Sequence, residues 1–134
     1  DVSYAVTEAF RCGKIVLACA TYDGFLFPPM ENLLAHLKTK SFQNRTVGLM
    51  ENGTWAPMAA KLMRAELESM KNITLCENVV TIRSAANAAA EAQMDALAAE
   101  LVAKQHDIKS SKRKHSRTFC KSLGVFFVSL LGSL

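Results

Sequence analysis

Two short segments of this chain each place one large aromatic side chain beside a glycine, directly after an apolar run. The first segment pairs Tyr22 with Gly24, and the second pairs Trp55 with Gly53. Two aromatic side chains can hold a flat ligand ring between them, and a flavin is the first ring to consider. Glycine lets the adjacent backbone turn so that an amide or a carbonyl faces the edge of such a ring. The two segments are therefore a candidate flavin site, provided that the fold brings them together.

Each of these residues also has a structural interpretation. Tyr22 would anchor a loop by half-burying its ring, and Trp55 would cover the end of a sheet. Asp23 and Glu51 would place negative charge near a bound ring, which disfavours an added electron, or they would form turns and face solvent. The binding interpretation depends on both aromatic segments lying at one edge of the fold.

The elements that position these segments alternate between strands and helices. We expect strands at Ile15–Ala20 and Thr46–Met50, and a third strand in two pieces at Ile73–Leu75 and Val79–Ile82. We expect four helices: a short one at Val6–Phe10, one that begins at Pro28, one that begins at Pro57, and one that has Ser84 as its N-cap and extends through about Ala103. Such alternation with short connections predicts right-handed βαβ units and an α/β fold with a parallel sheet. Neighbouring parallel strands end at the same edge, which is where open α/β sheets bind ligands.

Charge divides the 134-residue chain into two parts. Residues 1–103 carry nine Lys/Arg and eleven Asp/Glu, a net charge of −2, whereas residues 104–134 carry seven basic residues and one acidic residue, a net charge of +6. The total of +4 therefore describes the tail, and the body is not a basic protein. We expect one domain over residues 1–103, followed by a basic and then apolar extension or linker over residues 104–134.

Cysteine and histidine give little indication of chemistry. Cys12, Cys19, Cys76 and Cys120 form no C-x-x-C pair, and we interpret them as thiols of a reducing, cytoplasmic compartment. The three histidines are scattered, so no metal site is expected. The uncharged end Ser122–Leu134 has 13 residues. Because a spanning helix needs about 20, we expect no membrane span.

Two longer stretches carry a resemblance to a known family. Ala20–Glu31 and Arg45–Ala59 are similar, in order and spacing, to the two flavin loops of the flavodoxin-like domain of A-type flavoproteins. These flavodiiron proteins reduce oxygen or nitric oxide. The resemblance extends over about residues 1–102, and it implies a three-layer flavodoxin-like sheet with helices on both faces and FMN between the loops. It also implies that Tyr22 and Trp55 flank the ring. The cofactor-binding residues that it implies are Thr21, Tyr22, Asp23, Gly24, Asn52, Gly53, Thr54 and Trp55.

The chain departs from this family at its start. The family's first strand, its Ser/Thr-rich loop for the FMN phosphate and its first helix have no counterpart here, and Asp1–Ser3 is expected to end the second strand. We also find no resemblance to the family's metallo-β-lactamase-like half, with its di-iron ligands, within residues 1–134. We therefore expect an N-terminally truncated piece that binds FMN weakly and is not an active enzyme alone. In the intact protein the resemblance implies a rubredoxin-like electron donor, and a homo-oligomer in which the flavin meets the di-iron domain of a partner subunit.

The missing first strand leaves one edge of the sheet open. In the flavodoxin strand order that strand pairs with the equivalent of Ile15–Ala20. Gly124–Leu131 is rich in β-branched and aromatic residues and is a candidate to dock at this edge. The alternatives are that the tail is a linker into a lost domain or the product of a frame shift.

Two other functions remain open. Clustered Lys/Arg in the tail would suit a non-catalytic binding module that contacts nucleic acid phosphates or an anionic membrane, although we do not expect either partner for the leading interpretation. A fragment of a flavodoxin-like quinone reductase fits the fold but fits Glu51–Pro57 less well. The sequence favours an FMN-binding electron-transfer module.

Overall fold

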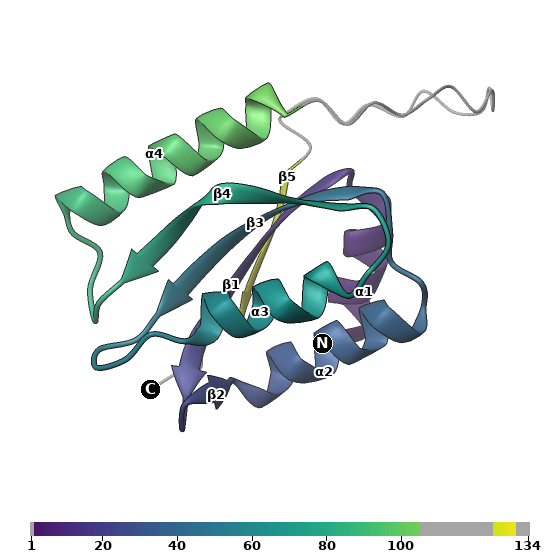
Figure 1. Ribbon diagram of the computed structural model, residues 1–134, viewed down its shortest axis with the longest axis horizontal. Coiled ribbons are helices and arrows are strands. Elements are labelled where there is room, and N and C mark those ends of the chain that lie inside the picture. Colours follow the sequence, from purple (N-terminus) through teal and green to yellow (C-terminus); the bar gives the residue numbers. More distant parts are fainter. Residues whose placement is uncertain (1, 105–124, 131–134) are drawn as a thin grey trace.

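The computed structural model describes residues 2–104 and the backbone of residues 125–130. In chain order the elements are α1 (Val2–Arg11), β1 (Lys14–Tyr22), β2 (Phe25–Leu26), α2 (Pro28–Thr39), β3 (Arg45–Asn52), α3 (Ala59–Glu68), β4 (Ile73–Ile82), α4 (Ala88–Ala103) and β5 (Val125–Leu130) (Figure 1). This alternation confirms the α/β class. None of the helices in the described part of the chain is long and apolar enough to cross a lipid bilayer.

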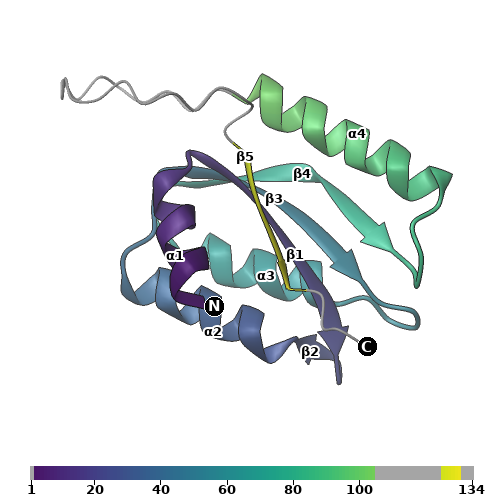
Figure 2. The same cartoon turned by 180° about the vertical axis from the view of Figure 1, so that it is seen from behind.

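β1 is the central strand of the sheet. Its residues 14–19 pair in parallel with both β3 and β5, so these two strands lie along opposite edges of β1. β4 pairs in parallel with β3, and the short β2 pairs antiparallel with the last residues of β1. Figure 2 shows β5 (yellow) beside β1 (purple). The predicted docking of the C-terminal apolar segment on the first strand is thus confirmed for Val125–Leu130, whereas the domain boundary after residue 103 stays a prediction.

Helices cover the sheet on both faces, and each face has its own apolar core. On one face α1, α2 and α3 pack on Ile15, Leu17 and Val47, and on the other face α4 packs on Val16 and Val80 (Figure 1). Consecutive residues of β1 therefore enter opposite cores, as expected for a strand that is buried on both faces. This burial is the reason that β1 is a continuous apolar run in the sequence.

Several element boundaries differ from the predictions, and β1 and β3 extend beyond Ala20 and Met50, to Tyr22 and Asn52. Val2 and Ser3 lie in α1 and do not end a strand, because Val2, Val6 and Ala9 form one apolar helix face on the core. The helix predicted to begin at Pro57 is α3, which begins at Ala59. The N-cap of α4 is Asn87, whose side chain accepts from the Ala90 amide, and Ser84 lies in a left-handed turn outside the helix with a φ of 69°.

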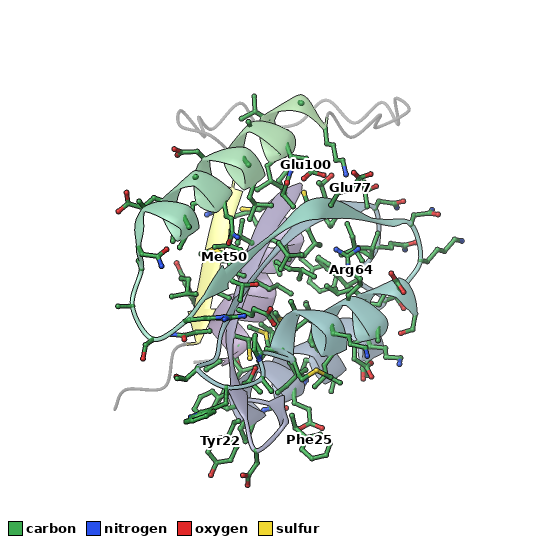
Figure 3. The ribbon with its side chains drawn as sticks, turned by 60° about the vertical axis from the view of Figure 1, so that its left-hand side comes forward. Tyr22, Phe25, Met50, Arg64, Glu77 and Glu100 are labelled. Atoms are coloured by element: carbon green, nitrogen blue, oxygen red, sulfur yellow. The ribbon has the colours of Figure 1, made fainter. Side chains whose placement is uncertain are left out.

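The predicted interruption of the third strand is a bulge within β4. The pairing with β3 shifts between Leu75 and Val79, so the backbone groups between them face no regular partner. Side chains from both faces satisfy these groups: Glu100 accepts from the Glu77 amide at 2.7 Å and the Asn78 amide at 2.9 Å, Lys104 donates to the Leu75 carbonyl at 3.0 Å, and Arg64 of α3 donates to the Cys76 carbonyl at 3.0 Å. Figure 3 shows Glu77 and Glu100 at one end of the molecule and Tyr22 and Phe25 at the other.

Gly48 of β3 packs closely against leucine side chains of α4. A Cβ atom there would lie 3.1 Å from Cδ1 of Leu97. We expect Gly48→Val to lower the free energy of unfolding by about 1–3 kcal/mol, because the branched side chain forces α4 away from the sheet. Urea unfolding measures this change. Gly13→Val is the matched control, since a Cβ at Gly13 meets nothing within 4 Å; equal losses in the two variants would contradict the close packing of α4.

Candidate functional site

The two aromatic segments leave the sheet at the same edge. β1 and β3 are parallel neighbours, and their last paired residues are Ala20 and Asn52. Tyr22 lies two residues beyond this pair along the chain, and Trp55 lies three residues beyond it. The expectation that both segments lie at the carboxyl edge of neighbouring strands is therefore confirmed. That edge is the usual ligand-binding edge of open α/β sheets.

The first segment is a tight β-hairpin and not an open loop. β1 continues through Tyr22, and Phe25 pairs antiparallel with it. The turn consists of Asp23 with a φ of 51° and Gly24 with a φ of 79°. Two successive left-handed residues are typical of the hairpin turn in which Asp-Gly is a preferred pair. Gly24 adopts a positive φ, which glycine takes up without steric cost, and Asp23 has the turn-forming role that its structural interpretation gave it.

The aromatic side chains at this edge are exposed. Trp55 is 97% exposed, so the interpretation that it covers the end of the sheet is wrong. Tyr22 is 57% exposed, and its ring meets that of Phe27 edge-on with centroids 6.2 Å apart. Phe25, which the sequence did not single out, is 70% exposed on the hairpin beside Tyr22 (Figure 3). Large apolar side chains gathered in the open at one edge are typical of a binding surface.

Two side chains of the sheet hold the second aromatic segment in place. The hydroxyl oxygen of Thr21 accepts from the amides of Met58 at 3.0 Å and Ala59 at 3.2 Å. The carboxylate of Glu51 accepts from the next amide, Ala60, at 2.8 Å. The N-cap residue of α3, Met58, makes no side-chain cap of its own. β1 and β3 thus supply the helix cap that the α3 sequence lacks, and this Thr21–Glu51 clamp fixes the end of the loop that carries Trp55.

Gly53 allows the loop to close tightly on itself. A Cβ atom there would lie 3.1 Å from Cα of Pro57 and 3.3 Å from the Thr21 hydroxyl oxygen. The Gly53 amide donates to the carbonyl of Ile82 at the end of β4, 3.1 Å away. The loop is therefore anchored at its start by β4 and at its end by the Thr21–Glu51 clamp, and Trp55 lies between these anchors.

Some of the other residues at the candidate site hold the structure together, and others are exposed to solvent. Asn52 ends β3, and Thr54 is exposed on the loop. Glu51 is 8% exposed and not solvated, because its second carboxylate oxygen accepts from the Thr81 hydroxyl at 3.0 Å. The sequence missed Thr81, since its place beside Glu51 depends on the register that the β4 bulge creates.

Two cavities adjoin this edge. The larger, of about 710 Å³, lies between the hairpin, α2 and α3, and Tyr22 and Phe25 are among its lining residues. The smaller, of about 420 Å³, lies between the ends of β3 and β4 and the start of α4, with Glu51 and Arg83 in its wall. Trp55 lines neither cavity. The Trp55 ring therefore lies on the open surface and the Tyr22 ring at the rim of the larger cavity, and a ligand held by both rings would lie across the edge of the sheet.

Comparison with solved structures shows a similarity of fold. No protein-family model matches the chain, and no curated protein does. Among solved structures, rubredoxin oxygen:oxidoreductase from the anaerobe Desulfovibrio gigas is similar with a TM-score of 0.63 and 18% sequence identity. The similarity covers 68% of this chain, which spans 22% of the length of that enzyme chain. The chain thus has a flavodoxin-like α/β fold, similar to that of part of this oxidoreductase chain.

Proposed function

We propose that this chain binds the ring of FMN between the Tyr22 hairpin and the Trp55 loop and acts as an electron-transfer module. The observation that carries the proposal is the pair of exposed aromatic side chains at the carboxyl edge of two neighbouring parallel strands. The anchored loop supports it, because a preorganised site loses less conformational entropy when a ligand binds. The fold relation to an oxidoreductase supports it further.

In this proposal the chain's own residues would hold the ring part of the cofactor. Residues 21–24 and 52–56 would supply backbone hydrogen bonds to the ring edge, and Tyr22 and Trp55 would lie against its faces. A bound flavin supplies the capacity to accept electrons from one partner and pass them to another. Asp23 and Glu51 would place negative charge near the ring and so disfavour an added electron.

The larger assembly follows from the resemblance to flavodiiron proteins. We propose that the chain corresponds to the FMN domain of a cytoplasmic oxygen or nitric oxide reductase and that it binds FMN more weakly than the complete domain. Its partners would be a rubredoxin-like electron donor and the di-iron domain of a second subunit in a homo-oligomer. That the chain spans only 22% of a solved reductase chain is consistent with a module that works within a longer protein.

Titration with FMN tests the ring site directly. We expect Trp55→Ala and Tyr22→Ala each to raise the dissociation constant about 5- to 10-fold, because each removes one aromatic contact with the ring. Flavin fluorescence and anisotropy report the binding. Trp55 is the one tryptophan of the chain, so quenching of its emission by FMN is a second signal from the site itself.

Tyr4→Ala is the matched control, since Tyr4 lies on α1 outside both loops and is 63% exposed, much like Tyr22. It should leave the dissociation constant unchanged. Equal weakening by all three substitutions, or none by either loop variant, would remove the proposed ring site.

A further inference from the structure

The amides at the start of α3 are already occupied by the protein. The amide groups at the beginning of a helix are the usual place for a phosphate, because they point outward and carry partial positive charge. In this chain Met58, Ala59 and Ala60 donate to the Thr21–Glu51 clamp at 2.8–3.2 Å. An anion at this helix start would have to displace a hydroxyl group and a buried carboxylate.

Charge at the same place also opposes a phosphate. Glu51 is 8% exposed and lies at the helix start itself, and Asp23 forms the turn of the hairpin on the neighbouring strand. Each of the two loops thus has an acidic residue within it or directly before it, and a phosphate dianion near either would meet a like charge. The oxidised ring system of a flavin carries no such charge and would meet the aromatic and backbone groups of the two loops.

We propose that the site between the two loops recognises the uncharged ring of a flavin and gains little from its phosphate, so that riboflavin and FMN bind with similar affinity. This inference rests on the proposed function, because it concerns the same ring site. The ligand class is then the flavin ring system and not the nucleotide. The Thr21–Glu51 clamp excludes the phosphate because it already occupies the amides at the start of α3.

The smaller cavity is the place where a phosphate could still bind. It adjoins the start of α4, and the guanidinium of Arg83 in its wall makes no hydrogen bond or ion pair with residues 2–104, although the Arg83 carbonyl accepts from the Ala85 amide. A flavin ring at the loops with its phosphate near Arg83 would give FMN a clear advantage over riboflavin. That alternative is a measurable outcome of the same experiment.

The test is a pair of titrations of the full chain, one with riboflavin and one with FMN, followed by fluorescence anisotropy. We expect the two dissociation constants to agree within about threefold at both about 0.02 M and about 0.5 M NaCl, because an ionic contact to phosphate would weaken at high salt. FMN binding more than about tenfold tighter at low salt would overturn the inference. If Arg83→Gln then removed that advantage, the phosphate would be assigned to the smaller cavity. Binding of neither flavin would overturn the proposed function itself, and the inference with it.

A variant isolates the role of the clamp. Glu51→Gln keeps the size of the side chain and removes its charge, so we expect the affinity for FMN to rise severalfold relative to that for riboflavin. Riboflavin is the internal control, since a general loss of structure would weaken both ligands alike. An unchanged ratio of the two affinities in Glu51→Gln would show that Glu51 does not exclude the phosphate. Because this arm depends on a folded variant, the unmodified chain carries the primary test.

Discussion

Replacing Val128 with proline is expected to lower the free energy of unfolding by about 3–5 kcal/mol and to make the chain aggregate. Val128 lies within β5, which pairs with β1 over six consecutive residues from Lys14 to Cys19. In the described part of the chain β5 pairs with β1 and with no other strand, so it is an edge strand. Proline there removes the backbone donor of residue 128 and fixes its φ, which disrupts the ladder where that amide faces β1. With about 1 kcal/mol for each lost hydrogen bond, the change is a large fraction of the 5–15 kcal/mol that stabilises a typical domain.

Aggregation should follow because β1 would become an edge strand. Its residues Ile15–Cys19 are all buried and apolar, and an unpaired strand of this type offers its backbone groups to another chain. Light scattering during thermal unfolding measures this tendency. Hydrogen exchange gives a local readout, since loss of β5 should speed exchange at the β1 amides that point toward β5 and spare those that point toward β3.

Val128→Thr is the control for this prediction. Threonine keeps the backbone donor and the β-branched shape, so it should cost much less than proline. A proline variant as stable as the parent chain would mean that β5 does not pair with β1 in solution. Equal losses in the two variants would place the effect in the side chain and not in the backbone pairing.

The parallel α/β fold could be predicted from the sequence because its strands and helices have clear local patterns. Ile15–Ala20 is a continuous apolar run, as a strand buried on both faces must be, and proline lies at the start of α2. The docking of β5 could also be predicted, since an open apolar edge and an unused β-prone segment occur in one chain. These features are local in sequence, and the tertiary structure did not override them.

The sequence-based predictions were wrong or incomplete where two nearby residues could both serve as the N-cap of a helix, or where a polar group bonds to a distant element. Ser84 and Asn87 are both good N-caps, and only the left-handed turn at Ser84 decides for Asn87. In the site, the position of the loops was predictable but the use of their polar groups was not. Thr21 caps a helix 37 residues away along the chain, which no local pattern indicates.

The second large effect is expected at the β4 bulge, far from the candidate flavin site. Glu100→Gln should lower the free energy of unfolding by about 2 kcal/mol at neutral pH, because hydrogen bonds to a charged group are stronger than neutral ones. The Glu100 side chain is 13% exposed, and it accepts from the amides of Glu77 and Asn78 and pairs with Lys104 at 2.7 Å. A glutamine has one acceptor oxygen, so it cannot replace both carboxylate contacts.

The same contacts make the effect depend on pH. Burial alone would raise the pKa of Glu100, but the hydrogen bonds from Lys104 and from the amides of Asn78 and Glu77 outweigh it and lower the pKa from 4.5 to about 2. A carboxyl group with a lowered pKa in the folded state stabilises the protein above its unfolded-state pKa. That contribution should fade as the pH falls from about 4.5 toward about 2. The parent chain should therefore lose its advantage over Glu100→Gln in this range.

Urea unfolding of both proteins at several pH values between 7 and 2 measures the difference. Asp95→Asn is the matched control, since Asp95 is an exposed carboxylate on the same helix and the change is likewise from acid to amide. A constant gap between the parent and Glu100→Gln at every pH would mean that Glu100 acts through its shape. If the difference in unfolding free energy from the parent disappears at low pH for Glu100→Gln and not for Asp95→Asn, the charge of Glu100 is what stabilises the backbone amides of the bulge. The bulge sets the register of the second half of β4 and so places Thr81 beside Glu51. Loss of the Glu100–Lys104 ion pair should therefore also loosen the Thr21–Glu51 clamp.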